Sequence, residues 1–141
     1  MTPAEDRAFD SLKVGDKASF ERTISDDDVR AFADLSGDYN PLHTDDSYAR
    51  TTEFGNRVVY GMFLGALVSR LVGMHLPGKR ALFMKESLEF KKPVYIGDTV
   101  RVEGVITSAS NATRIIELDI RLSTEKGLVA AGQAHVRVRD A

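Results

Sequence analysis

One stretch of the chain, residues 58 to 76, constrains the fold more than any other. It reads VVYGMFLGALVSRLVGMHL, and 13 of its 19 residues are apolar while only Arg70 carries a formal charge. A run of about 20 apolar residues is long enough to span a bilayer. Arg70 and His75 interrupt this run, however, and the remainder of the chain reads as a β-sheet. We therefore expect no membrane span, and instead a helix that is apolar on nearly every side and is wrapped by its own chain.

The second half of the sequence supplies strands that could wrap this helix. Apolar and polar residues alternate most clearly in 113–123, which places Ile116, Leu118, Ile120 and Leu122 on one face. Turn signals separate the predicted strands, which cover 17–24, 87–91, 99–107, 113–123 and 128–139. The pattern indicates an α+β fold with one domain over residues 1–141, in which a curved antiparallel sheet surrounds one long helix.

Composition excludes several classes of function. The chain has 141 residues, the size of one ordinary domain. Its 19 basic and 21 acidic residues give a net charge of -2, which argues against a nucleic-acid partner. With no cysteine, the protein has no disulfide, thiol nucleophile or thiolate zinc site. Its first ten residues lack the apolar region of a secretory signal, so we expect a cytoplasmic protein.

A polar loop precedes the apolar helix and carries the candidate catalytic residues. It reads LSGDYNPLH over residues 35–43, after a shorter helix that we expect to begin at Ser25 and end at Gly37. On a continuous helix, Asp38 and His43 would lie about 140° apart. Pro41 disfavours a helical conformation at Asn40, and this break lets the two side chains converge.

An aspartate and a histidine brought together in this way can activate water. One group removes a proton while the other orients the water or returns a proton to the substrate. Asn40 could hold the loop by hydrogen bonds. Two alternatives stay open from these residue types: an ordinary structural loop, and a metal site built from His43, Asp45 and Asp46 with Asp38.

Gly61 is the second candidate, because it lies where the apolar helix is expected to begin. Amide groups in the first turn of a helix have no partner within it, and the helix dipole adds partial positive charge there. Such an amide can stabilise a developing oxyanion, and glycine has no Cβ to block the approach. The alternative interpretation is that Gly61 only permits close packing. No Asp or Glu occurs between Arg57 and Lys79, so a carboxylate on this helix is excluded.

Four segments together resemble a known family: LSGDYNPLH, Tyr60-Gly61-Met62, LPGK at 76–79 and SLEFKKPVYIGDTV at 87–100. They are similar to the MaoC-like (R)-specific enoyl-CoA hydratases, the hydratase 2 group with a hot-dog fold, over nearly the whole chain. The resemblance implies a long helix wrapped by an antiparallel sheet. It also implies a homodimer that completes its acyl-CoA sites, with no cofactor beyond the CoA of the substrate.

The resemblance also implies roles for single residues. Asp38 and His43 match the pair that activates the water added to a trans-2-enoyl-CoA, which gives a (3R)-3-hydroxyacyl-CoA. Gly61 matches the glycine whose amide receives the thioester oxygen, and Asn40 and Ser69 match supporting residues. The chain departs from the family in that Tyr60 stands where many relatives have histidine, and Gly65-Ala66 where they often have Ala-Ser.

Three other functions remain as alternatives. The same residues would serve a dehydratase acting on acyl-carrier-protein thioesters or on an unusual acyl group. A hot-dog thioesterase is disfavoured by the missing carboxylate on the helix, and a non-catalytic acyl-CoA binding module by the intact Asp38 and His43. The basic candidates for the CoA phosphates are Arg57, Lys79, Arg80, Lys91 and Lys92. Leu64, Leu71 and Val72 are candidates to line the acyl chain, although core packing is the simpler role for them.

Overall fold

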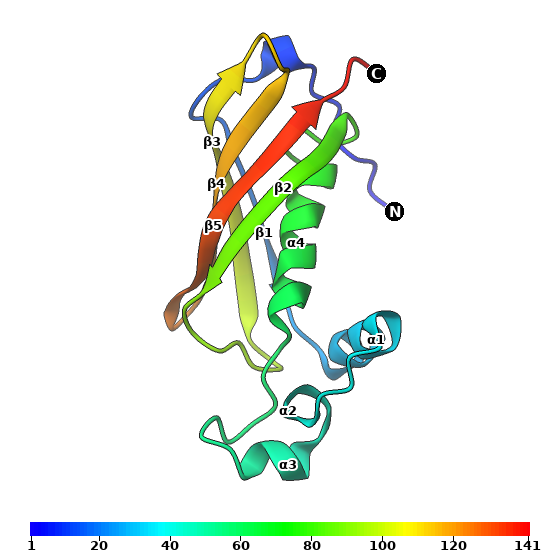
Figure 1. Cartoon of the computed structure of the whole chain (residues 1–141), viewed down its shortest axis with the longest axis vertical. Coiled ribbons are helices and arrows are strands. Elements are labelled where there is room, and N and C mark those ends of the chain that lie inside the picture. Colours follow the sequence, from blue (N-terminus) through cyan, green and yellow to red (C-terminus); the bar gives the residue numbers. More distant parts are fainter.

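A five-stranded antiparallel sheet curves around one side of a long helix, α4, in the computed structural model of all 141 residues (Figure 1). After a 3₁₀ turn at Phe9–Ser11, the elements are β1 (Lys17–Thr23), α1 (Asp26–Ser36), α2 (Pro41–Thr44), α3 (Asp46–Arg50), α4 (Gly61–Met74), β2 (Ala81–Phe90), β3 (Thr99–Ser110), β4 (Ile115–Thr124) and β5 (Gly127–Val138). The strand order is β1-β3-β4-β5-β2, so β1 and β2 are the edges. The α+β, hot-dog arrangement expected from the sequence is confirmed.

The core lies between the sheet and α4. Alternate residues of β4 point inward, and the predicted set of Ile116, Leu118, Ile120 and Leu122 is fully buried. Ile120 pairs with Gly104 of β3 on one side and with Gly132 of β5 on the other. An ideal Cβ at position 104 would lie 2.6 Å from Leu71 Cδ2. Glycine at this position therefore lets α4 pack closely against the middle of the sheet.

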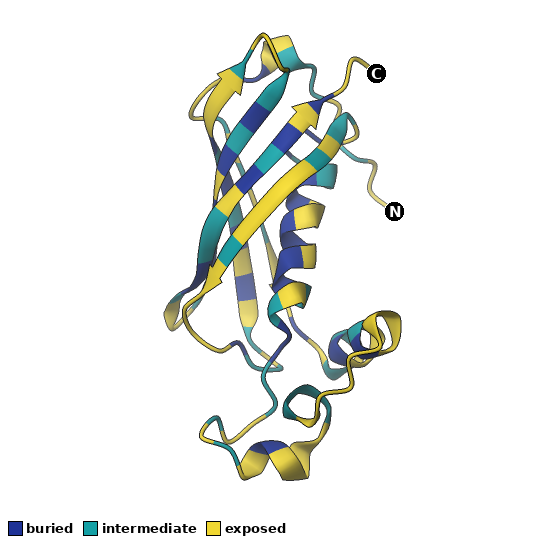
Figure 2. Cartoon of the chain, in the orientation of Figure 1, coloured by how far each residue is buried: buried dark blue, intermediate teal, exposed yellow.

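Helix α4 is wrapped by the sheet, as expected, but only one side of it is buried. Its inner face, which includes Leu64, Val68 and Leu71, is buried against the sheet (Figure 2). The outer face is exposed and carries Met62, Ala66, Ser69 and Arg70. The physical reason is that five strands cover one side of the helix and leave both sheet edges free. No helix in the structure is both long and apolar enough to cross a membrane.

Strand β2 begins at Ala81, six positions before the predicted start at 87. Its register against β5 shifts between Phe83 and Lys85, which marks a β-bulge. A bulge reverses which residues point inward, so the first half of the strand shows no continuous alternation in the sequence. Beyond the bulge, Leu88 packs against the core.

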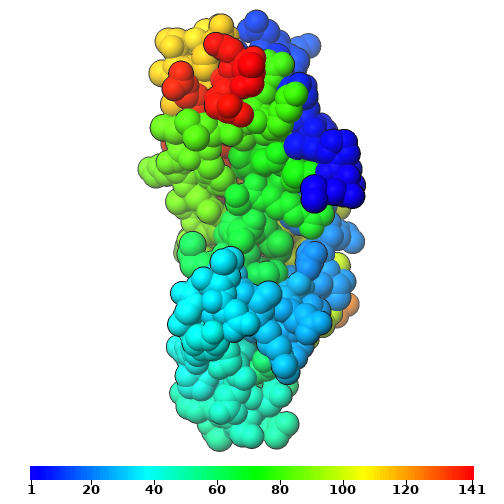
Figure 3. Space-filling view, turned by 90° about the vertical axis from the view of Figure 1, so that its right-hand side faces the viewer, coloured from blue at the N-terminus to red at the C-terminus, as the bar shows by residue number.

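Three short helices form a separate group at the N-terminal end of α4 (Figure 1), and they gather at one end of the molecule (Figure 3). Helix α1 begins as predicted, because Ser25 and Asp28 form a reciprocal capping box. Gly37 ends it in a left-handed conformation with φ of 75°. That conformation favours glycine and turns the chain into the loop that carries Asp38.

Candidate active site

The loop between α1 and α2 is held by its own polar side chains. Asp38 Oδ1 accepts a hydrogen bond from the Asn40 amide at 3.0 Å. Asn40 is the N-cap of α2, and its Oδ1 accepts from the Leu42 amide at 3.0 Å. Pro41 takes the first position of α2, where its missing N–H costs nothing. The Asn-Pro break thus starts a new one-turn helix, which carries His43 away from the axis of α1.

His43 has a defined tautomer when its imidazole is neutral. Its Nδ1 lies 2.5 Å from the carbonyl oxygen of Val58. Because a carbonyl can only accept, Nδ1 is the protonated donor, and this leaves Nε2 able to accept a proton. The ring also packs on Tyr60, with ring centroids 4.0 Å apart and planes inclined by 32°. His43 is therefore oriented as a base through Nε2.

Tyr60 connects the two candidate catalytic residues. It is 3% exposed, and its hydroxyl donates a hydrogen bond to the main-chain carbonyl of Asp38. Burial and the negative charge of Asp38 raise the pKa of the Tyr60 hydroxyl, so it stays a neutral donor. The Asp38 side chain itself is exposed, and no hydrogen bond joins its carboxylate directly to the imidazole.

His43 and Gly61 line the same cavity, which has a volume of about 340 Å³. Its apolar wall includes Phe54, Val58, Val59, Leu64, Phe90 and Val94. Gly61 is the first residue of α4, where the amide has no partner within the helix and the dipole is positive. The arrangement can hold a carbonyl oxygen at the Gly61 amide within reach of a base.

Phe90 of β2 lies directly over Gly61. An ideal Cβ at position 61 would be 2.9 Å from Phe90 Cζ. Glycine at this position therefore lets the Phe90 ring lie close to the start of α4, which is the close-packing role that the sequence left open beside the oxyanion role. Leu64 also lines the cavity, whereas Leu71 and Val72 are core residues with exposures of 0% and 1%.

The structure separates the five basic candidates for phosphate binding. Lys91 and Lys92 line the cavity, although Lys91 also pairs with Glu89 at 3.6 Å and Lys92 donates to the Lys126 carbonyl at 2.9 Å. Lys79 and Arg80 instead form ion pairs with Asp6, at 2.9 and 2.5 Å. Arg57, whose side chain is 11% exposed, pairs with Asp26 and Asp46.

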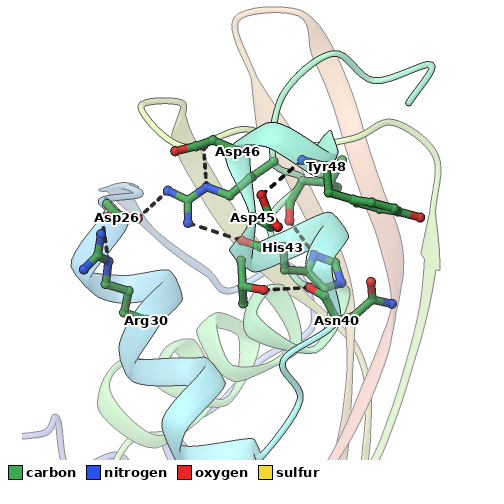
Figure 4. A network of polar contacts seen from close by, with 10 residues as sticks. Asp26, Arg30, Asn40, His43, Asp45, Asp46 and Tyr48 are labelled. Carbon is green, nitrogen blue, oxygen red and sulfur yellow. Dashed lines mark hydrogen bonds and ion pairs between the residues drawn. The ribbon is translucent and has the colours of Figure 1, made fainter. Parts of the chain in front are cut away.

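Arg57 has a structural position that the sequence did not reveal. Its guanidinium binds Asp26 at the start of α1 and Asp46 at the start of α3, and it donates to the main-chain carbonyl of His43 at 3.4 Å. These three partners are labelled in Figure 4. The hydrogen bond from Arg57 holds the pKa of the Asp26 carboxyl below its usual value. Arg57 thus joins the helix that precedes the loop to the helices that follow it.

Other predicted site residues lie outside this arrangement. Ser69 is exposed on α4, about two turns after Gly61, and does not line the cavity. Asp45 caps α3 by accepting from the Tyr48 amide at 3.1 Å. Asp46 is paired with Arg57, and no group of three His, Asp or Glu side chains gathers as a metal site would require.

The sequence marks Tyr60 only as a departure from the family, and it does not predict the contacts of Tyr60 with Asp38 and His43. An aromatic residue directly before Gly61 was the available signal. It gave no indication of a partner because the hydroxyl bonds a residue 22 positions earlier in the chain.

Comparisons with known proteins show the family to which this chain is similar. The family model described as MaoC like domain matches residues 11–127. The chain is 42% identical to an (R)-specific enoyl-CoA hydratase of Aeromonas caviae, over 91% of this chain and 96% of that protein. It is 35% identical to a 3-hydroxybutyryl-CoA dehydratase of Methylorubrum extorquens, over 92% and 83%.

A solved structure is similar over almost the full length. It is the unliganded R-hydratase PhaJ1 from Pseudomonas aeruginosa, with a TM-score of 0.92 and 32% sequence identity. The match covers 98% of this chain and 89% of that one. The family model covers most of the chain, and this chain belongs to the MaoC-like domain family.

Proposed function

We propose that this protein catalyses the (R)-specific hydration of trans-2-enoyl-CoA to (3R)-3-hydroxyacyl-CoA, and the reverse dehydration. One observation carries the proposal: His43, with Nε2 free to accept a proton, shares an apolar cavity with the amide of Gly61. The 42% identity to a protein named (R)-specific enoyl-CoA hydratase supports the same reaction and its stereochemistry.

The mechanism assigns one task to each group. The thioester oxygen accepts a hydrogen bond from the Gly61 N–H. The partial positive charge at the start of α4 stabilises the enolate as it forms. Asp38 orients a water molecule, which adds its oxygen to C3 as His43 Nε2 removes a proton. The enolate then collapses when a proton is returned to C2, so that one water has been added across the double bond.

The residues that line the cavity suggest where the CoA and the acyl chain of the substrate would bind. Lys91 and Lys92 are the basic residues along it, and we assign them the anionic end of CoA. The acyl chain would contact the apolar wall at Leu64. We further propose that the protein acts as a homodimer and needs no cofactor beyond the CoA of its substrate. A cytoplasmic location and a single domain over residues 1–141 stay predictions.

The test is to incubate the purified protein with crotonyl-CoA and then with longer trans-2-enoyl-CoAs. Loss of the conjugated thioester absorbance, without release of free thiol, is expected for a hydratase. Release of free thiol would instead identify a thioesterase. Acyl-CoA binding without turnover of any enoyl-CoA would contradict the proposed reaction and favour a binding module.

A further inference from the structure

The side chain of Tyr60 contacts both members of the proposed catalytic pair. Its hydroxyl bonds the main chain of Asp38, and its ring lies against the imidazole of His43. Phe32 of α1 packs on the same ring, with centroids 4.9 Å apart. Tyr60 therefore contacts the Asp38 main chain, the His43 ring and the Phe32 ring, and close packing against these groups restricts its motion.

One contact of Tyr60 is with a main-chain oxygen and the other is with a side-chain ring. The hydrogen bond fixes the backbone of the Asp38 loop, whereas the ring contact fixes the tilt of the His43 imidazole. His43 Nδ1 is also bound to the Val58 carbonyl, two residues before Tyr60. The segment that ends in the Gly61 amide thus determines where the imidazole and the Asp38 backbone lie.

We propose that Tyr60 is a positioning residue for the hydratase reaction, which sets the placement of the Asp38 carboxylate relative to the His43 imidazole. The inference rests on the proposed function for its kinetic effect. Tyr60 is only 3% exposed and its hydroxyl is bonded to the Asp38 carbonyl, so we assign it an action through the pair and no contact with substrate.

The chemical state of Tyr60 suits this role. Because burial raises the pKa of its hydroxyl, the phenol keeps its proton and remains a donor across the working range of pH. Its hydroxyl is bonded to the Asp38 carbonyl, so it holds the loop in this neutral state. Its contribution is geometric, and displacement of a catalytic group by about 1 Å is enough to lower a rate by a factor on the order of 100.

The first experiment removes only the hydroxyl. In Tyr60→Phe the ring contact with His43 remains while the bond to Asp38 is lost. We expect kcat for crotonyl-CoA to fall about 10-fold with KM changed by less than about 2-fold, because ground-state binding is unaffected. Tyr95→Phe is the matched control, since Tyr95 also donates a hydroxyl to a loop carbonyl, that of Phe54, at 3.4 Å. We expect it to retain wild-type kcat.

A second comparison separates positioning from general destabilisation. In an Asp38→Asn background the carboxylate that Tyr60 positions is already lost, so adding Tyr60→Phe should lower kcat by no more than about 2-fold. A further 10-fold fall in that background would mean that Tyr60 acts independently of Asp38, and it would overturn the inference. An unchanged kcat in the single variant Tyr60→Phe would do the same.

One readout does not depend on activity. Amide hydrogen exchange at Asn40 and Leu42 reports whether the loop is held, because both amides are bonded within it. We expect faster exchange at these amides in Tyr60→Phe and not in Tyr95→Phe. Unchanged exchange would overturn the positioning role even in an active enzyme. A wild-type protein that fails to hydrate any enoyl-CoA would instead reject the proposed function.

Discussion

At the scale of single residues, an added methyl group at Gly61 would lie within the proposed site. In Gly61→Ala the new Cβ would come within 2.9 Å of the Phe90 ring, which is 49% exposed and can move. We expect the free energy of unfolding to change by less than about 1 kcal/mol. Because the displaced ring and the methyl group both narrow the cavity, kcat/KM for crotonyl-CoA should fall on the order of 10-fold.

The matched control for this variant lies in the same helix. A Cβ at Gly73 would meet no heavy atom within 4 Å. Gly73→Ala should therefore keep wild-type activity and raise the unfolding free energy by about 0.5–1 kcal/mol, measured by urea denaturation. Wild-type kcat/KM in Gly61→Ala would contradict the assignment of this amide to the thioester.

Some residue-level features could be predicted because they depend on near neighbours in the sequence. Ser25 caps α1, Gly37 ends it, and Asn40 with Pro41 starts a new helix. Arg57 was beyond such reasoning, since its partner Asp26 is 31 positions away. Contacts of that kind require the tertiary fold, which local propensity and spacing do not contain.

At the scale of elements, Arg57 holds together the helices on either side of the loop that carries Asp38. Removing its charge in Arg57→Gln leaves Asp26 and Asp46 without their common partner. Since the guanidinium is mostly buried, we expect the free energy of unfolding to fall by about 1–3 kcal/mol. Arg30→Gln is the control, because its pair with Asp26 lies at the surface and should contribute under about 1 kcal/mol.

The same contact predicts a pH dependence. The pKa of Asp26 is lowered in the folded protein, mainly by its hydrogen bond from Arg57. The stabilisation is therefore complete above the usual carboxyl pKa of about 4 and is lost as pH falls through the lowered value. Thermal melts from pH 7 to pH 3 should show a smaller loss of stability for Arg57→Gln than for the wild type. Parallel curves would contradict this contact.

The strands show why some elements were predictable and another was not. In β4 the alternation is continuous, and its inward residues were identified correctly. In β2 the bulge between Phe83 and Lys85 interrupts the alternation, so only the half beyond the bulge was recognised. A period-two pattern predicts a strand only where the register against its neighbour is regular.

At the scale of the whole molecule, the exposed face of α4 and the free edge of β2 suggest a common partner. The sequence predicted a helix apolar on nearly all sides, and one chain buries only one of them. Met62 on α4 and Leu82, Met84 and Phe90 on β2 are large apolar side chains left exposed. An apolar pattern indicates that a helix face is buried, but it does not indicate whether the same chain or a second chain buries it.

The family resemblance implies a homodimer, and from these exposed side chains we expect its two copies to pair through β2. Sedimentation should give a mass of about twice the 15.5 kDa of the chain. Lysine at both positions in a Leu82→Lys, Met84→Lys variant should yield monomers, because charge on an edge strand opposes strand pairing. A wild-type monomer at micromolar concentration would contradict this pairing.

In the proposed reaction, Asp38 and His43 hydrate an enoyl thioester held at the Gly61 amide. The most direct measurement is the rate of crotonyl-CoA hydration by Asp38→Asn and by His43→Ala, with the configuration of the wild-type product determined. Asp27→Asn, at an exposed position of α1, and His135→Gln, on β5, serve as controls. We predict a (3R) product, folded variants with rates lowered about 10²–10⁴-fold, and unaffected controls. A folded Asp38→Asn, His43→Ala double variant with near wild-type activity would contradict the account.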